Sequence, residues 1–404
     1  AWVDLIGGFV AAAGETRLGV PLIYGVDAVH GHSNVRGATV FPHNIGLGAI
    51  DDPELVRRIG RATATEMAAT GAHWAFAPCV AVPPDIRWGR TYEGYGRDPQ
   101  LVSRLGAALV TGLQGAPGDD VRAMACPKHF LGDGGTAWAS VPRPDWLTWW
   151  DGWGPGWQMD QGDTRVDEAE LRDIHLTPYR AAIAAGAMSI MVSYSSWNGA
   201  KLHGHRPLLT DVLKGELGFE GFVVSDWMGI DQLHRSYDRC VIDAINAGID
   251  MVMVPLDYRR FIAAAERVIR AGRIPMDRVD DAVRRILRAK AGLGLFDQPR
   301  ERPRLDVVGC ADHRRLAAEA ARRSCVLLKG ADVLPIDRAE PIEVAGVAAD
   351  DIGLQCGGWT VGWQGGSGPT TPGTSFVAAL RNAHAGPVEY ARDGRFVDGE
   401  AART

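Results

Sequence analysis

The sequence lacks three features that would each indicate a particular class of protein. No two of its six cysteines are separated by just two residues, as in Cys-x-x-Cys, so it has neither a dithiol redox motif nor the paired cysteines of a zinc site. No apolar run is long enough to span a bilayer. A net charge of −6 gives little attraction to nucleic acid or to an anionic membrane. We therefore expect no nucleic-acid partner and no membrane insertion, and the cysteines do not identify the compartment.

The bulk composition is that of a globular protein. Hydrophobic residues make up 46% of the sequence and charged residues 23%, and 404 residues are enough for a barrel and a second unit. The sequence opens without methionine, directly in an amphipathic pattern, and no signal peptide is visible. We expect the start to be missing, and a secretion signal in that missing part would favour a periplasmic or secreted location.

Strand-like apolar runs and amphipathic helices alternate up to about residue 295. The expected strands are 20–26, 73–80, 121–127, 187–194, 222–224 and 249–255, and the expected helices are 1–14, 53–71, 99–112, 166–186, 209–217, 237–248, 258–272 and 275–292. This order predicts an α/β protein with a (β/α)8 TIM-like barrel at 1–295, although only six strands are clear. A linker at 296–312 and an incomplete α/β sandwich domain at 313–404 are expected to follow.

Polar side chains stand where the expected strands end. They are Asp27, Arg90, Lys128, His129, Tyr194 and Asp226. Carboxyl ends of parallel strands share one face of a sheet or barrel, so we expect these residues around one site able to grip several hydroxyl groups. A carboxylate followed by a tryptophan, as in Asp226-Trp227, suits attack at an anomeric carbon beside a stacked sugar ring. Alone, Asp226 is explained equally well as a helix cap, and Arg90 as the ion-pair partner of Glu93.

Two histidine pairs and a tryptophan-rich segment need separate interpretation. His30 and His32, with Lys, His and Asp on later strands, outline a metal-dependent hydrolase barrel, which stays an alternative. The second pair, at 203–205, carries no predicted role. The segment from about 132 to 163 holds six tryptophans and is either functional or an aromatic plug. A non-catalytic fragment that binds carbohydrate is a further alternative.

Eight stretches spread over nearly the whole chain carry a family resemblance. They read IYGVDAVHGH, FPHNIGLGA, WGRTYEGYGRDP, CPKHFLGDGGT, MVSYSSWNG, GFVVSDWMGID, AGIDMVMVP and QCGGWTVGWQG. In this order they resemble family 3 glycoside hydrolases, in the exo-β-glucanase/β-glucosidase branch. The resemblance implies a (β/α) barrel followed by an α/β sandwich, a retaining mechanism without metal or cofactor, and a β-linked glucose oligosaccharide or polysaccharide as substrate. The implied activity is exo-acting release of glucose from non-reducing ends.

The resemblance also implies roles for individual residues. Asp226 corresponds to the nucleophile; Asp27, Arg90, Lys128, His129 and Tyr194 correspond to the shell around the terminal sugar; and Trp227 and Trp363 correspond to the walls of the next sugar's slot, with Trp359 close by. The acid/base Glu of this branch has no counterpart before residue 404. Glu93 and Asp133 are considered in its place only because they are expected near the site.

Two other departures from the family concern specificity. The N-acetylglucosaminidase branch has a histidine where this chain has Leu131-Gly132-Asp133, so that branch is rejected. Gln161 and Gln232 stand where relatives often carry charged residues, so the linkage preference stays open.

Overall fold

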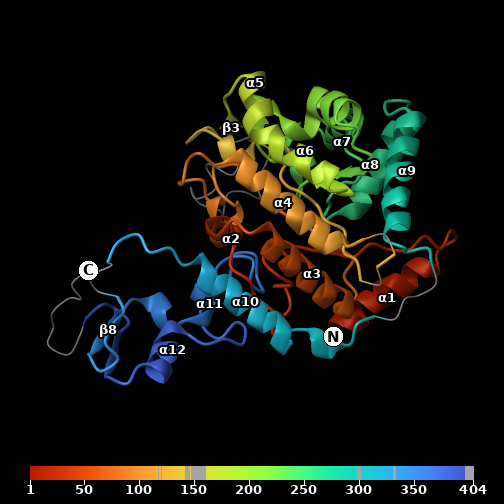
Figure 1. Cartoon of the computed structure of the whole chain (residues 1–404). Coiled ribbons are helices and arrows are strands. Elements are labelled where there is room, and N and C mark those ends of the chain that lie inside the picture. Colours follow the sequence, from red (N-terminus) through yellow and green to blue (C-terminus); the bar gives the residue numbers. More distant parts are fainter. Residues whose placement is uncertain are drawn as a thin grey trace.

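The computed structural model describes residues 1–116, 118–119, 121–141, 146, 161–297, 302–330 and 334–395. In these ranges, helices and strands alternate in the expected order along the first three quarters of the chain (Figure 1). The α-helices are α1 Trp2–Gly14, α2 Asn44–Ile50, α3 Pro53–Thr70, α4 Pro99–Gln114, α5 Glu168–Glu170, α6 Thr177–Ala184, α7 Tyr237–Ala247, α8 Tyr258–Arg270, α9 Met276–Gly292, α10 Ala311–Ser324, α11 Ile352–Cys356 and α12 Phe376–Ala383. The strands are β1 Gly25–Val26, β2 Trp74–Ala75, β3 Asp163–Thr164, β4 Ser189–Met191, β5 Ser196–Trp197, β6 Ala200–Lys201, β7 Phe222–Val224, β8 Ile342–Ala345 and β9 Val388–Ala391. None of the described helices is long and apolar enough to cross a membrane.

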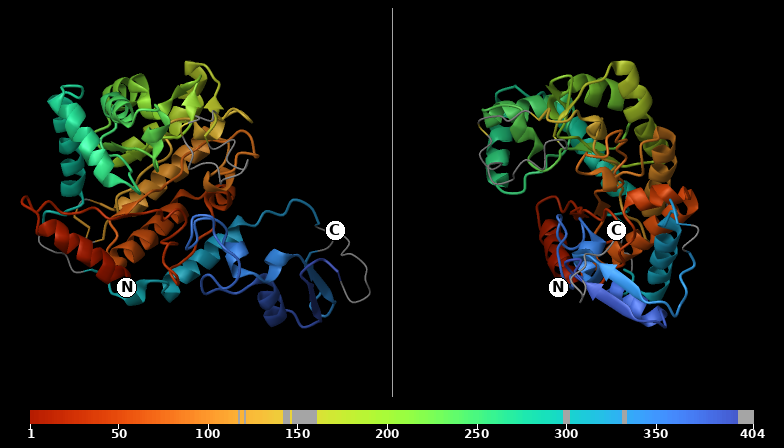
Figure 2. Two further views of the ribbon diagram at one scale, coloured as in Figure 1. Left: turned by 180° about the vertical axis from the view of Figure 1, so that it is seen from behind. Right: turned by 90° about the vertical axis from the view of Figure 1, so that its left-hand side faces the viewer.

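Most strand pairs of the first part are parallel, and β5 and β6 form an antiparallel pair beside them, with β3 parallel to β5. β1 pairs with β2 and β4 with β7, while single parallel bridges join Trp74 to Met124, Phe130 to Val192 and Val224 to Met251. Helices α3, α4 and α6 lie side by side on the outside of these strands (Figures 1 and 2). The α/β class expected from the sequence is therefore confirmed.

The paired strands are shorter than the sequence analysis expects. The run at 20–26 pairs only at Gly25–Val26, and the run at 249–255 has a single bridge, at Met251. Prolines occur in most of these runs, at 21, 78, 127 and 255. A proline nitrogen cannot donate a ladder hydrogen bond, so the chain stays extended there without regular pairing.

Local sequence explains where the helices begin and end. Asp52 accepts a hydrogen bond from the Leu55 backbone N–H at 3.0 Å, and Pro53 occupies the first position of α3. The helix ends at Gly71, whose φ of +91° is in the left-handed region that glycine adopts without strain. Between α3 and α4, a Cβ on Gly60 would lie 3.0 Å from the Cα of Gly112, so glycine is needed for these helices to approach closely.

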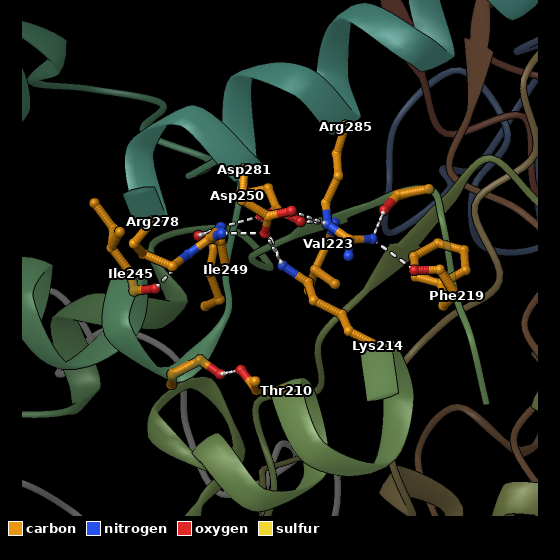
Figure 3. A network of polar contacts seen from close by, with 12 residues as sticks. Thr210, Lys214, Phe219, Val223, Ile245, Ile249, Asp250, Arg278, Asp281 and Arg285 are labelled. Atoms are coloured by element: carbon orange, nitrogen blue, oxygen red, sulfur yellow. Dashed lines mark hydrogen bonds and ion pairs between the residues drawn. The ribbon is translucent and has the colours of Figure 1, made fainter. Parts of the chain in front are cut away.

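A buried polar network connects α9 to β7 (Figure 3). The fully buried Asp250 accepts from Lys214 Nζ at 2.7 Å, from the Val223 backbone N–H at 2.8 Å and from the Arg278 guanidinium. Asp281 also pairs with Arg278 and Arg285. Burial lowers the pKa of Lys214 to about 8, against the opposing pull of the Asp250 carboxylate. The carboxylate of Asp250 thus neutralises cations that would otherwise be buried at high cost.

The last quarter of the described chain joins the first part through α10 and the loop after α11. Helix α10 packs on α2 and α3, and the buried Glu66 of α3 accepts from the Gly309 N–H and contacts His313 at 2.8 Å. Strands β8 and β9 pair in parallel and lie with α12 to one side of the main body (Figures 1 and 2). This arrangement brings the loop at 356–363 against the loop that follows β1.

Candidate functional site

The carboxylate of Asp226 lies directly after the buried strand β7. Its backbone N–H donates to His203 Nε2 at 3.0 Å, and its Oδ1 accepts from the Trp227 N–H at 2.6 Å. Its Oδ2 lies 3.7 Å from Nε2 of His129, which lies on the segment bridged to the other side of β4. The side chain is about one-tenth exposed, so the carboxylate is nearly shielded from water while facing an imidazole.

Lys128 and His129 form a buried basic pair beside Asp226. Nδ1 of His129 lies 2.9 Å from Asp133 Oδ2, and both side chains are almost fully buried. Burial, reinforced by the charges of Arg90 and Lys128, holds the pKa of His129 well below its usual value. The imidazole is therefore neutral at neutral pH, with its Nδ1–H donated to Asp133 and its Nε2 turned toward Asp226.

Arg90 and Glu93 form a bidentate ion pair on the loop after β2. Arg90 Nε lies 2.7 Å from Glu93 Oε1, and its Nη2 lies 2.9 Å from Oε2. Burial raises the pKa of Glu93, but the charges of Arg90 and Lys128 outweigh it and keep the pKa below its ordinary value. Glu93 is therefore ionised and engaged at both oxygens, and Asp133 is engaged by His129. Glu93 therefore lacks the free proton that a general acid donates.

Three tryptophans contribute faces of different kinds. The ring of Trp359 lies 5.0 Å from Lys128 Nζ and 5.8 Å from the Arg90 guanidinium carbon, which are cation–π distances. Trp363 packs edge-on against Trp359, with ring centroids 6.2 Å apart. Trp227 and Trp363 are each about half exposed, so each presents an apolar face to solvent next to the charged groups.

The loop carrying Trp359 has a strained backbone held by contacts with the first part of the chain. Trp359 has a φ of +61°, which is uncommon for a residue other than glycine. Thr360 Oγ1 lies 3.1 Å from His30 Nε2, and the Val361 N–H donates to the Ser33 carbonyl at 2.7 Å. A Cβ on Gly358 would lie 2.5 Å from the Tyr92 hydroxyl, so a larger residue there would displace the Tyr92 side chain. The surrounding contacts therefore determine where the Trp359 ring lies.

Tyr194 and Asp27 complete the set expected from the sequence. The Tyr194 hydroxyl donates to the Trp227 carbonyl, which places Tyr194 beside the Asp226 turn. Asp27 follows β1 at the same end of the strands and accepts from Asn34 Nδ2 at 3.1 Å. Direct contacts thus connect Asp226, His129, Lys128, Arg90, Trp359 and Tyr194, while Asp27 is placed by the strand order alone.

His30 and His32 do not converge as metal ligands would. The ring nitrogens of His30 contact the Phe41 carbonyl and Thr360 Oγ1, whereas His32 Nε2 contacts Thr70 Oγ1 at 2.8 Å. Among the described residues, one group has ligand atoms close enough for a metal ion: Cys79, His129 and Asp133, all within 4.8 Å of one another. Burial raises the pKa of the Cys79 thiol, which stays protonated, and the His129–Asp133 hydrogen bond already explains the proximity of the other two.

The structure corrects one expectation and extends another. The pair at 203–205 is not incidental, because His203 accepts the backbone N–H of Asp226. A histidine in a loop before a helix gives no sequence signal for such a long-range contact. Gln232 donates to Gln161 Oε1 at 3.2 Å and accepts from Lys201 Nζ at 2.8 Å, so the two glutamines noted in the sequence are partners. Most of the tryptophan-rich segment lies outside the described residues.

Together these observations define an α/β protein with a polar, tryptophan-bordered site at the carboxyl ends of parallel strands. Residues 2–144 and 155–289 match the model of the glycosyl hydrolase family 3 N terminal domain. The chain therefore belongs to glycosyl hydrolase family 3, as the sequence motifs predict.

Curated relatives and solved structures agree with this membership. The chain is 36% identical over 403 residues to a lysosomal beta glucosidase of Dictyostelium discoideum, covering 94% of this chain and 46% of the relative. It is 32% identical to a periplasmic beta-glucosidase of Salmonella typhimurium, covering 91% and 46%. The structure of an exo-1,3/1,4-beta-glucanase from a Pseudoalteromonas species matches with 43% identity and a TM-score of 0.88, covering 98% of this chain and 50% of that chain. This chain thus spans about half the length of these relatives.

Proposed function

We propose that this chain carries the nucleophile half of a retaining, exo-acting β-glucosidase or β-glucanase that releases glucose from non-reducing ends. In a retaining reaction a carboxylate attacks the anomeric carbon and forms a covalent glycosyl-enzyme, which water then hydrolyses. Asp226 is the nucleophile in this proposal. Asp27, Arg90, Lys128, His129 and Tyr194 bind the hydroxyl groups of the terminal sugar, and Trp227, Trp359 and Trp363 border the next one.

The observation that carries the proposal is the setting of Asp226. Its Oδ2 faces Nε2 of the neutral His129 at 3.7 Å, and His129 adjoins the buried Lys128. The Lys128 ammonium lies over Trp359. Buried cations and donors beside a shielded carboxylate are costly as scaffolding but suit a ligand with several hydroxyls. A similar solved structure is that of a Listeria innocua beta-glucosidase in complex with glucose, which supports this class of ligand.

The fold fits the same proposal. The successive parallel pairs β1–β2 and β4–β7, with the bridges between them, support a (β/α)8 barrel with the site at the carboxyl ends of its strands. In this division residues 1–295 form the barrel domain, 296–312 the linker and 313–404 part of an α/β sandwich domain. The general acid is expected from outside the described site, because Glu93 and Asp133 are both engaged.

The test is covalent labelling with a 2-deoxy-2-fluoro-β-glucosyl fluoride, followed by peptide mass spectrometry. This reagent carries its own good leaving group, so it reports attack by the nucleophile without needing a general acid. We expect one label, on Asp226, and none in the Asp226→Asn variant. Asp238→Asn is the matched control, because Asp238 lies on α7 in an exposed ion pair with Arg267. Labelling of another carboxylate would refute the assignment of Asp226.

The same samples separate the remaining alternatives. Glucose binding by calorimetry without labelling would indicate a carbohydrate-binding fragment rather than an enzyme. Activity lost on chelation and restored by Zn²⁺ would favour a metal-dependent hydrolase, although His30 and His32 contact separate partners.

A further inference from the structure

The turn that carries Asp226 includes a non-glycine residue in the left-handed backbone region. Met228 has a φ of +52°, in the left-handed region. The Asp226 carbonyl accepts from the Gly229 N–H, and the Met228 N–H donates to the Met253 carbonyl. Two further backbone groups are satisfied by one distant segment: the Asp226 N–H by His203 and the Trp227 carbonyl by the Tyr194 hydroxyl. The segment 194–203, which contains β5 and β6, therefore contacts the turn on both sides of the Asp226–Trp227 peptide.

The ring of His203 is held in one orientation and one tautomer. A backbone N–H can only donate, so Nε2 of His203 carries the lone pair and Nδ1 carries the proton, which is directed to the Ser193 carbonyl. The side chain is about 1% exposed, and a Cβ on Gly229 would lie 2.3 Å from its Nε2. Burial, with help from the charge of Lys201, lowers the pKa of His203 to about 3, so the ring stays neutral at neutral pH. Nε2 of His203 therefore remains an acceptor for the Asp226 N–H at neutral pH.

We propose that His203 is a positioning residue for the reaction, whose neutral Nε2 fixes the backbone of Asp226 so that the carboxylate meets the anomeric carbon in line. This role rests on the proposed function of Asp226 as nucleophile. His203 does not touch the sugar; it acts through the Asp226 N–H. Without the acceptor, a buried donor is left unmet and the turn relaxes toward another partner. A displacement of about 1 Å at a reacting group costs on the order of 100-fold in rate.

The experiment compares substitutions that separate ring shape from hydrogen bonding. His203→Phe keeps a flat ring but removes the acceptor, whereas His203→Gln places an amide oxygen near the position of Nε2. The labelling rate constant with the 2-fluoro glucosyl fluoride reports nucleophile placement, and calorimetry with glucose reports sugar binding. We expect His203→Phe to label about 100-fold more slowly with glucose affinity nearly unchanged, and His203→Gln to recover most of the rate.

A matched control and a second perturbation keep the test decisive. His205 lies two residues on, and its Nδ1 accepts the Leu208 N–H at 3.2 Å, so His205→Phe keeps a flat ring and removes a similar interaction away from the Asp226 turn. It is expected to label at the wild-type rate. Gly229→Ala leaves His203 intact but forces its ring away from the Asp226 N–H, and it should slow labelling as well. This variant provides the answer if His203→Phe does not fold.

The outcomes distinguish the positioning role of His203 from the proposed function of Asp226 as nucleophile, on which it rests. If His203→Phe and Gly229→Ala both label at the wild-type rate, the positioning role is wrong while the nucleophile assignment stands. If His203→Gln is as slow as His203→Phe although it folds normally, the ring's shape rather than its acceptor is what matters, and the proposal is again overturned. If the wild-type chain is not labelled at Asp226, the proposed function itself fails, and the role of His203 fails with it.

Discussion

The replacement Glu93→Gln tests whether Glu93 organises the site or serves as its missing general acid. Glu93 is about 1% exposed and binds Arg90 through both oxygens, at 2.7 and 2.9 Å. Its charge also offsets that of Lys128. We expect the amide to leave Arg90 with one weaker acceptor and the two buried cations without their common counter-charge.

The size of the effect follows from the burial of the pair. Removing one partner of a buried ion pair costs about 3–5 kcal/mol, because the other charge stays buried and uncompensated. We expect the lower end of this range, since the Arg90 side chain is 15% exposed and water can reach part of it. Because Arg90 and Lys128 then shift relative to Asp226, activity should fall roughly 100-fold.

The assay compares two aryl glucosides, one with a very good leaving group and one with a poor leaving group. A scaffolding role predicts that Glu93→Gln slows both substrates by a similar factor, because sugar placement is common to both. Loss of a general acid instead slows only the substrate whose leaving group needs protonation. Retained activity on the good leaving group, together with loss on the poor one and an undiminished unfolding free energy, would refute the scaffolding argument.

Three further predictions concern stability and binding. Asp250→Asn should lower the unfolding free energy in urea by about 3–5 kcal/mol, and Lys214→Met in the same chain should recover part of it; an effect below about 1 kcal/mol would contradict the network in Figure 3. Trp359→Ala should weaken glucose binding roughly tenfold by calorimetry, through loss of the face over Lys128, and more than Trp363→Ala does. Burial lowers the pKa of five histidines to about 3 or 4, so between pH 6.5 and that value the unfolded chain binds more protons and stability falls as pH falls. The five histidines are His30, His32, His73, His175 and His203. At pH 5 the free energy of unfolding should fall by about 2 kcal/mol per histidine, at 1.36 kcal/mol per pKa unit. A urea midpoint that stays constant from pH 7 to pH 5 would contradict this prediction.

Local patterns in the sequence predict the helices and most of the site. Helix α3 is delimited by Asp52 and Gly71, whose capping roles depend on neighbours a few residues away. Asp226 and His129 are recognisable because a charged or polar residue that ends an apolar run must face a ligand or a partner. Strand lengths are predicted less well, because pairing depends on which backbone groups of another segment come within reach, and prolines interrupt it.

The positions of His203 and Trp359 depend on contacts between distant segments, which local patterns do not reveal. His30, which the sequence suggests as a metal ligand, instead lies 3.1 Å from Thr360 and stacks on His43 with ring centroids 3.9 Å apart. His43 Nε2 in turn lies 3.2 Å from the Cys356 carbonyl. The histidines near β1 therefore anchor the loop that holds Trp359 over Lys128. A histidine motif after a first strand can be required for the site without binding any ligand, because it determines where a residue more than 300 positions later lies.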